Sequence, residues 1–139
     1  MPRQLGLFNQ LTLNVLRDFK AAMAKDAEES GLSREELCDQ MNLLAERHGV
    51  RLVKGTGQNI TMATLEKWLN PEDKERVIPV KGLPVFLAAT GGIRTMQVLV
   101  APLGWQVIDE RQARRLELAE LEDDIKEKKA RIRKLAADL

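Results

Sequence analysis

The chain has 139 residues and a net charge of +1, and 44% of its residues are hydrophobic. This length is enough for one domain with a hydrophobic core and one further element. No segment has the roughly 20 consecutive apolar residues that span a bilayer, and the first residues lack a signal-peptide pattern. The only cysteine, Cys38, cannot form an internal disulfide. We therefore expect a cytoplasmic protein without a membrane partner.

The first predicted helix covers about residues 11–30 and ends at Gly31. Leu16, Phe19 and Met23 share its apolar face, and this face is flanked by Arg17, Lys20 and Lys25. The acidic residues along the chain fall on helix faces that we expect to be solvated, or in the C-terminal segment.

The second predicted helix has the strongest start signal. Ser33 and Glu36 have the spacing of a capping box, in which each side chain accepts a hydrogen bond from the other residue's N–H. The helix should end at Gly49 and bury the apolar side chains Leu37, Met41 and Leu44.

A connection of about ten residues follows, with a short extended piece possible at 51–53. The third predicted helix begins after Thr61, which acts as its N-cap, and ends at Asn70-Pro71. Its inward side chains are Leu65, Trp68 and Leu69.

Two short helices are predicted next. One covers about residues 80–90, with Leu83, Phe86 and Leu87 inward, and the other about residues 93–101, with Met96, Leu99 and Val100 inward. Trp105 and Val107 then alternate around Gln106, a pattern typical of a short strand or an extended strap across the core.

Residues 109–139 read as a terminal helix with nine basic and nine acidic side chains. Its positions a and d form a heptad seam, which predicts a coiled coil that pairs two copies of the chain; these positions are Leu118, Leu121, Ile125, Lys128, Ile132, Leu135 and Leu139. Isoleucine at a with leucine at d favours parallel pairing. Antiparallel pairing and folding back onto residues 1–108 stay open. The sequence therefore predicts two domains, a helical body at residues 1–108 and a dimerisation helix at residues 109–139.

The second and third helices together have the pattern of a helix-turn-helix, in which the second member enters the major groove of DNA. The expected contacts to bases come from Thr61, Ala63, Thr64 and Lys67. Phosphate contacts are expected at the start of the second helix and in the connection, from Ser33, Arg34, Arg51, Lys54, Gln58 and Asn59. A paired chain would then read two half-sites about one helical turn apart.

Three segments carry a family resemblance. GLSREELCDQM (31–41) resembles the opening of lambda-repressor-like helix-turn-helix domains. TLEKWLNPED (64–73) followed by IPVKGLPVFLAATG (78–91) is similar to the CII-type regulators of temperate phages, and PVKGLPVFLAATG also resembles small early-region proteins of Mu-like transposable phages. The resemblance implies an all-α, lambda-repressor-like bundle of about five helices that controls transcription on double-stranded DNA.

Two features favour a rival reading, a protein-interaction module such as an adaptor or anti-repressor. The net charge is almost zero, and the connection is longer than the three or four residues usual between such helices. His48, the only histidine, and Cys38 have no partners at metal-ligand or catalytic spacing. We expect no enzyme activity, no cofactor and no small-molecule substrate.

Overall fold

A computed structural model describes residues 12–54 and 59–139. Within these ranges the chain forms six α-helices and two 3-10 turns and no strand, which confirms the all-α prediction. By contacts the chain divides into two compact units, with the division between Gln106 and Val107. We call them the body and the tail, and each is described by itself.

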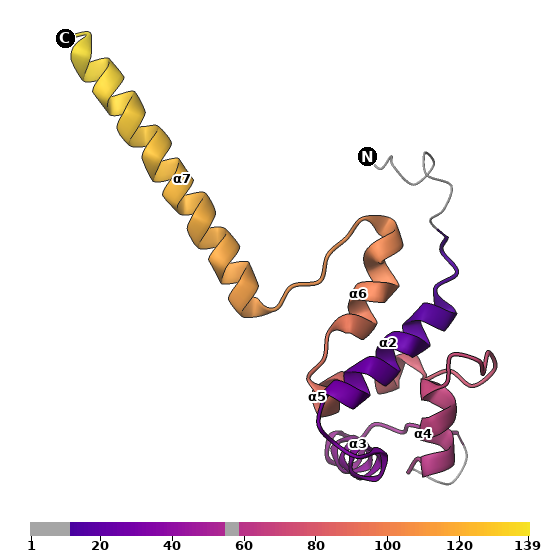
Figure 1. Cartoon of the computed structure of the whole chain (residues 1–139). Helices are drawn as coiled ribbons and strands as arrows, with labels where there is room; N and C mark the ends of the chain where they lie inside the picture. The colour runs from indigo at the N-terminus through magenta and orange to yellow at the C-terminus, as the bar shows by residue number, and fades with distance from the viewer. Residues whose placement is uncertain (1–11, 55–58) are drawn as a thin grey trace. The chain divides into compact units, whose positions relative to one another are not determined.

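The body contains five of the described helices (Figure 1). They are α2 (Leu16–Glu29), α3 (Arg34–His48), α4 (Met62–Leu69), α5 (Leu83–Thr90) and α6 (Arg94–Val100), with the 3-10 turns η1 (Val80–Gly82) and η2 (Ala101–Leu103). α2 packs against α4, α5 and α6, and α3 packs against α4 and α5. α2 and α3 are therefore the two helices around which the shorter ones assemble.

Local signals in the sequence explain where these helices begin and end. Ser33 and Glu36 form the predicted capping box, and Thr61 accepts a hydrogen bond from the Thr64 N–H at the start of α4. Gly49 ends α3 with φ of 66°, a left-handed conformation that costs glycine little.

The core lies between α2, α3, α4 and α5. Leu37, Met41 and Phe86 are fully buried there. The inward prediction for α4 is confirmed, because Leu65, Trp68 and Leu69 are all buried. Leu52 and Ile60, at the two ends of the connection between α3 and α4, are buried as well, so both ends of this long connection are anchored in the core.

Lys20, which flanks the apolar face of α2, is fully buried. Its Nζ donates to the carbonyl oxygen of Lys67, at 2.8 Å, and to that of Asp73. Lys67 lies in the last turn of α4, where the helix dipole favours a cation, and its carbonyl oxygen also accepts from the Asn70 N–H at 3.3 Å. Burial lowers the pKa of Lys20, against the opposing charge of Asp73.

Asp26 corrects the expectation that all acidic side chains are solvated, because it is 97% buried. One carboxylate oxygen, Oδ2, accepts from the Thr95 N–H at 3.0 Å and from the Thr95 hydroxyl at 2.8 Å. Thr95 is in the first turn of α6, so this carboxylate caps α6 from outside the helix.

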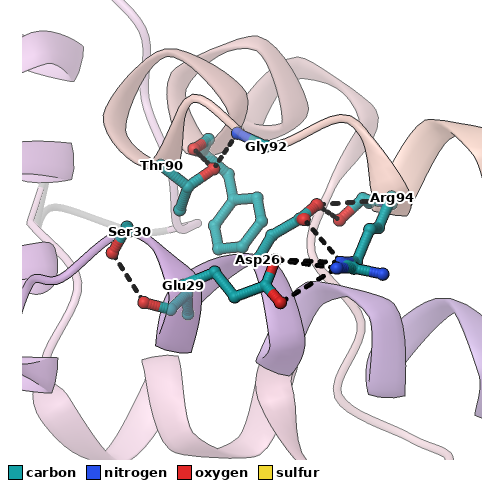
Figure 2. A network of polar contacts seen from close by, with 9 residues as sticks. Asp26, Glu29, Ser30, Thr90, Gly92 and Arg94 are labelled. Carbon is teal, nitrogen blue, oxygen red and sulfur yellow. Dashed lines mark hydrogen bonds and ion pairs between the residues drawn. The ribbon is translucent and has the colours of Figure 1, made fainter.

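Figure 2 shows the groups around this carboxylate. Arg94 stands 4.0 Å from Asp26 and makes a bidentate contact with Glu29 at 2.9 Å. Gly92 lies so close that an added Cβ would stand 2.4 Å from the Asp26 carboxyl carbon. The Gly92 N–H donates to the Thr90 hydroxyl, which holds the turn between α5 and α6.

Two predictions about the end of the body are wrong. In α6, Thr95 is buried at its contact with Asp26, whereas Leu99, one turn further along the same side of the helix, is exposed. Residues 105–107 form no strand, and the Trp105 side chain is exposed rather than strapped across the core.

The tail consists of α7 (Glu110–Ala137), a helix of 28 residues with no buried residue. Asp109 caps it, since its side chain accepts from the Gln112 N–H and the Gln112 side chain accepts from the Asp109 N–H. No described helix is both long and apolar enough to cross a membrane.

We expect Asp26→Ala to lower the free energy of unfolding by about 2 kcal/mol, because it leaves the buried Thr95 N–H and hydroxyl without an acceptor. Gly92→Ala should also destabilise the body, because the new methyl group would collide with the carboxylate. Urea denaturation measures both losses. Glu29→Gln is the control, because the Arg94–Glu29 ion pair is exposed and its loss should lower the free energy of unfolding by less than about 1 kcal/mol. Equal losses for Asp26→Ala and Glu29→Gln would show that the carboxylate does not hold α6.

Candidate nucleic-acid interface

The start of α3 is fixed by its capping box. The Glu36 N–H donates to the Ser33 hydroxyl at 3.0 Å, and the Ser33 N–H donates to a Glu36 carboxylate oxygen at 2.9 Å. The Ser33 N–H holds the pKa of Glu36 below its ordinary value. Ser33 is exposed, but its hydroxyl oxygen already accepts a hydrogen bond within the cap, so the first cationic side chain of α3 is that of Arg34.

The start of α4 is fixed to α3 by one side chain. Asn42 donates through Nδ2 to the carbonyl oxygen of Ile60 at 3.0 Å and accepts through Oδ1 from the Ile60 N–H at 2.8 Å. The buried Cys38 thiol also donates to the Ile60 carbonyl, and burial raises its pKa. Because Ile60 immediately precedes the Thr61 cap, these contacts set the position of the α4 N-terminus relative to α3.

The exposed side of α4 presents Ala63 and Lys67, which are one turn apart. Beside them runs a groove of about 530 Å³ between the start of α3 and the end of α4. We call it the Arg34 groove; it is lined by Arg34, Ala63, Glu66, Lys67, Leu69, Asn70 and Pro71. Arg34 forms an ion pair with Glu66 at 3.5 Å, so one acid lies among these cations.

A second groove, of about 610 Å³, lies along the neighbouring side of α4. We call it the Arg76 groove; it is lined by Leu52, Val53, Lys54, Thr64, Trp68, Glu75, Arg76, Val77, Pro79 and Lys81. Three of these side chains are basic and one is acidic, and they come from two segments on either side of α4 in the chain, one at Lys54 and one at residues 75–81. This concentration of positive charge beside Thr64 gives α4 a basic flank.

The segment that supplies Arg76 is folded by Asp73. Its carboxylate oxygen Oδ1 accepts from the N–H groups of Glu75 and Arg76, each at 3.0 Å. The Arg76 N–H contributes most to holding the pKa of Asp73 below its ordinary value. Lys20 binds the carbonyl oxygen of the same Asp73, so the turn is held both by its own side chain and by the core.

The structure separates the residues that the sequence predicted for DNA contact. Arg34, Ala63 and Lys67 meet in the Arg34 groove, and Lys54 and Thr64 meet in the Arg76 groove. Ser33, Arg51, Asn59 and Thr61 are exposed but line neither groove, and Gln58 lies outside the described residues.

Sequence reasoning missed Glu66, Arg76 and Lys81. Glu66 could have been predicted from the sequence, since it lies three residues after Ala63 and one before Lys67 on the same helix. Arg76 and Lys81 follow α4 in a segment without periodicity, so no helical pattern pointed to them. Only packing brings them to the side of α4.

The described residues hold no group of three or more histidine, cysteine, aspartate or glutamate side chains that could bind a metal ion. Comparisons of the chain with protein-family models, curated proteins and solved structures give no match.

We expect the Glu36 cap to make stability depend on pH. A carboxyl group whose pKa is lowered in the folded protein stabilises it above the unfolded pKa, about 4.3, and this contribution is lost as the pH falls through the lowered value. The wild-type chain should therefore exceed Glu36→Gln in stability at pH 7, and the gap should close on acidification. Thermal unfolding at several pH values measures it, with Glu35→Gln as control. A gap that stays constant down to pH 2 would contradict the assignment.

Proposed function

We propose that this protein is a DNA-binding transcriptional regulator in which α3 and α4 act as a helix-turn-helix and α4 enters the major groove. The observation that carries the proposal is the arrangement of charge around α4. Its outer side presents the exposed Ala63 and Lys67 and the half-buried Thr64, whose hydroxyl lies 3.1 Å from that of Thr61. Basic side chains lie on both flanks, Arg34 on one and Lys54, Arg76 and Lys81 on the other. A helix that reads base edges between two phosphate strands needs this distribution.

The length of the connection between α3 and α4 does not weaken the proposal. Leu52 and Ile60 anchor both ends of the connection in the core, and Asn42 binds the residue before the α4 cap. The two helices are thus in direct contact despite the extra residues. A lambda-repressor-like regulator of phage type, as the sequence resemblance implies, is the form of the function that we propose.

The tail supplies the second half of the function. Pairing of α7 would make the protein a two-fold symmetric dimer, and such a dimer binds a pseudo-palindromic site with one half-site for each body. The local basic flanks then act twice on one DNA duplex, which compensates for a net charge of only +1 per chain.

A protein-interaction module is the second candidate. The Arg34–Glu66 ion pair favours it, because it places an acid at the centre of the surface that would face DNA. Exposed apolar side chains near the end of the body also favour it, namely Leu99, Leu103 and Trp105. In this case the body would bind another protein through the same helices without contacting nucleic acid.

Selection of a bound sequence from a randomised duplex pool, followed by fluorescence anisotropy, separates the two candidates. A regulator should bind the selected duplex at least a thousandfold more tightly than a scrambled one, and its affinity should fall steeply between about 50 and 200 mM salt. A folded protein that binds neither duplex at the lower salt contradicts the proposal and supports the interaction module.

We expect Thr64→Ala and Lys67→Ala each to reduce discrimination between the selected and scrambled duplexes by about 1–3 kcal/mol. Both side chains are outside the core, so circular dichroism and the melting temperature should change little. Lys25→Ala, which removes an exposed cation of α2, is the matched control and should leave discrimination unchanged. Unchanged discrimination in both α4 variants would rule out base reading by this helix.

We expect Arg76→Ala and Lys81→Ala to weaken binding to selected and scrambled duplexes alike. Each loses one phosphate contact, so the slope of log affinity against log salt should decrease by about one. Lys74→Ala is the control, because Lys74 is exposed in the same segment but does not line the Arg76 groove. If all three variants behave alike, the groove has no special role in binding the DNA backbone.

A further inference from the structure

The tail exposes an apolar stripe that has no cover within its own unit. Leu118, Leu121, Ile125, Ile132 and Leu135 are each between 52% and 65% exposed, and α7 buries no residue. Water strongly disfavours five such side chains on one face of a helix, and a lone helix gains little from packing. The stripe therefore needs a partner surface, and the charges beside it define which one.

The charges of α7 are segregated along its length. Residues 117–124 contain five acidic side chains and no basic one, for a net charge of −5. Residues 125–134 contain six basic side chains and one acidic one, for a net charge of +5. The helix is therefore complementary to a copy of itself that runs in the opposite direction, and self-complementarity is the property of a two-fold interface.

We propose that α7 pairs with α7 of a second copy as an antiparallel coiled coil. This inference rests on the pairing of α7 in the proposed function, but it does not depend on DNA binding. Parallel chains would place −5 beside −5 and +5 beside +5, whereas antiparallel chains place each acidic half beside a basic half.

One register satisfies the whole stripe. Positions a and d then meet in alternating layers: Leu118 faces Leu135 of the partner subunit, Leu121 faces Ile132 of the partner subunit, and Ile125 faces Lys128 of the partner subunit. All layers have the same offset, so no apolar position is left unmatched between 118 and 135. The apolar layers contain leucine and isoleucine in either orientation, so the charged positions decide between them.

Lys128 also favours the antiparallel orientation. In a parallel pair, two copies of Lys128 would face each other at the same d layer, and like charges would meet in the seam. In the antiparallel register they are in separate layers, each beside Ile125 and next to the carboxylate at position 124 of the other helix.

The flanking positions e and g give the same result. In the antiparallel register Glu122 pairs with Lys129 of the partner subunit, and Asp124 pairs with Arg131 of the partner subunit. Glu117 faces Asp138 of the partner subunit, which is a repulsive pair near the end of the helix, so attractive pairs outnumber repulsive ones two to one, and two-fold symmetry repeats each of them. In the parallel register Glu117 would instead face Glu122 of the partner subunit, a repulsive pair, and only Asp124 with Lys129 of the partner subunit would attract.

Disulfide cross-linking of the full chain tests the orientation. Leu118→Cys and Leu135→Cys are made separately, one with an affinity tag so that mixed dimers differ in mass. A disulfide needs Cα atoms about 4.4–6.8 Å apart, which the proposed register provides only between the two different variants. The wild-type chain is the blank, since its one cysteine, Cys38, is buried. The expected result is a cross-linked mixed dimer and little cross-linking of either variant alone.

Two outcomes overturn the proposal. Cross-linking of Leu135→Cys to itself without mixed dimers would show a parallel coil, with the dimeric part of the proposed function intact. A chain that sediments as a monomer and forms no cross-link would remove pairing altogether. The assay contains no DNA, so neither outcome depends on whether α4 binds a duplex.

A charge reversal gives an independent test, because it should weaken an antiparallel dimer and strengthen a parallel one. Glu122→Lys should raise the dimer dissociation constant roughly tenfold in the antiparallel coil, where it faces Lys129 of the partner subunit twice. The double variant Glu122→Lys, Lys129→Glu should restore it. In a parallel coil Glu122→Lys would tighten the dimer, since it replaces a repulsive pair.

Glu120→Lys is the matched control for this test. It changes the charge of the same segment by the same amount, but position c does not face the partner helix. Its effect on sedimentation equilibrium should be several times smaller than that of Glu122→Lys, and an equal effect would overturn the proposed register.

Discussion

The body depends on two buried charges that α2 contributes to other helices. Lys20 binds backbone carbonyls at the end of α4, and Asp26 binds the N–H of Thr95 at the start of α6. Each charge has the sign that the helix dipole favours at that end, so α2 stabilises two helices that are too short to be stable alone. Because a buried charge is costly without its partners, these contacts also fix where α4 and α6 pack.

The candidate interface follows from this arrangement. The Lys20 ammonium donates to the carbonyl oxygens of Lys67, in α4, and of Asp73, in the turn after it, so one side chain in the core fixes both α4 and the segment that supplies its basic flank. On the other side, Asn42 and the Ser33–Glu36 cap set the start of α4 and of α3. The position of α4 is therefore fixed mainly by hydrogen bonds between side chains and the backbone. For this reason α4 needs few apolar residues of its own.

Body and tail use opposite physical means. The body is held by a core and by buried polar caps, whereas the tail buries no residue of its own. In the antiparallel register the first residues of the two α7 helices would be about 50 Å apart, at a rise of 1.5 Å per residue.

The sequence by itself determined the elements whose causes are local. The Ser33–Glu36 box, the Thr61 cap, the inward side of α4 and the heptads of α7 depend on neighbours within one or two helical turns, and these patterns could be predicted. The Asp109–Gln112 cap has the same local cause and could also have been predicted from the sequence. Only the tertiary structure decided that Lys20 and Asp26 are buried, that Thr95 is buried and Leu99 exposed, and that Arg76 and Lys81 line the same groove as Thr64. Each of these features depends on groups from segments distant in the chain. The periodicity of a helix does not predict which end of another helix a buried charge will contact.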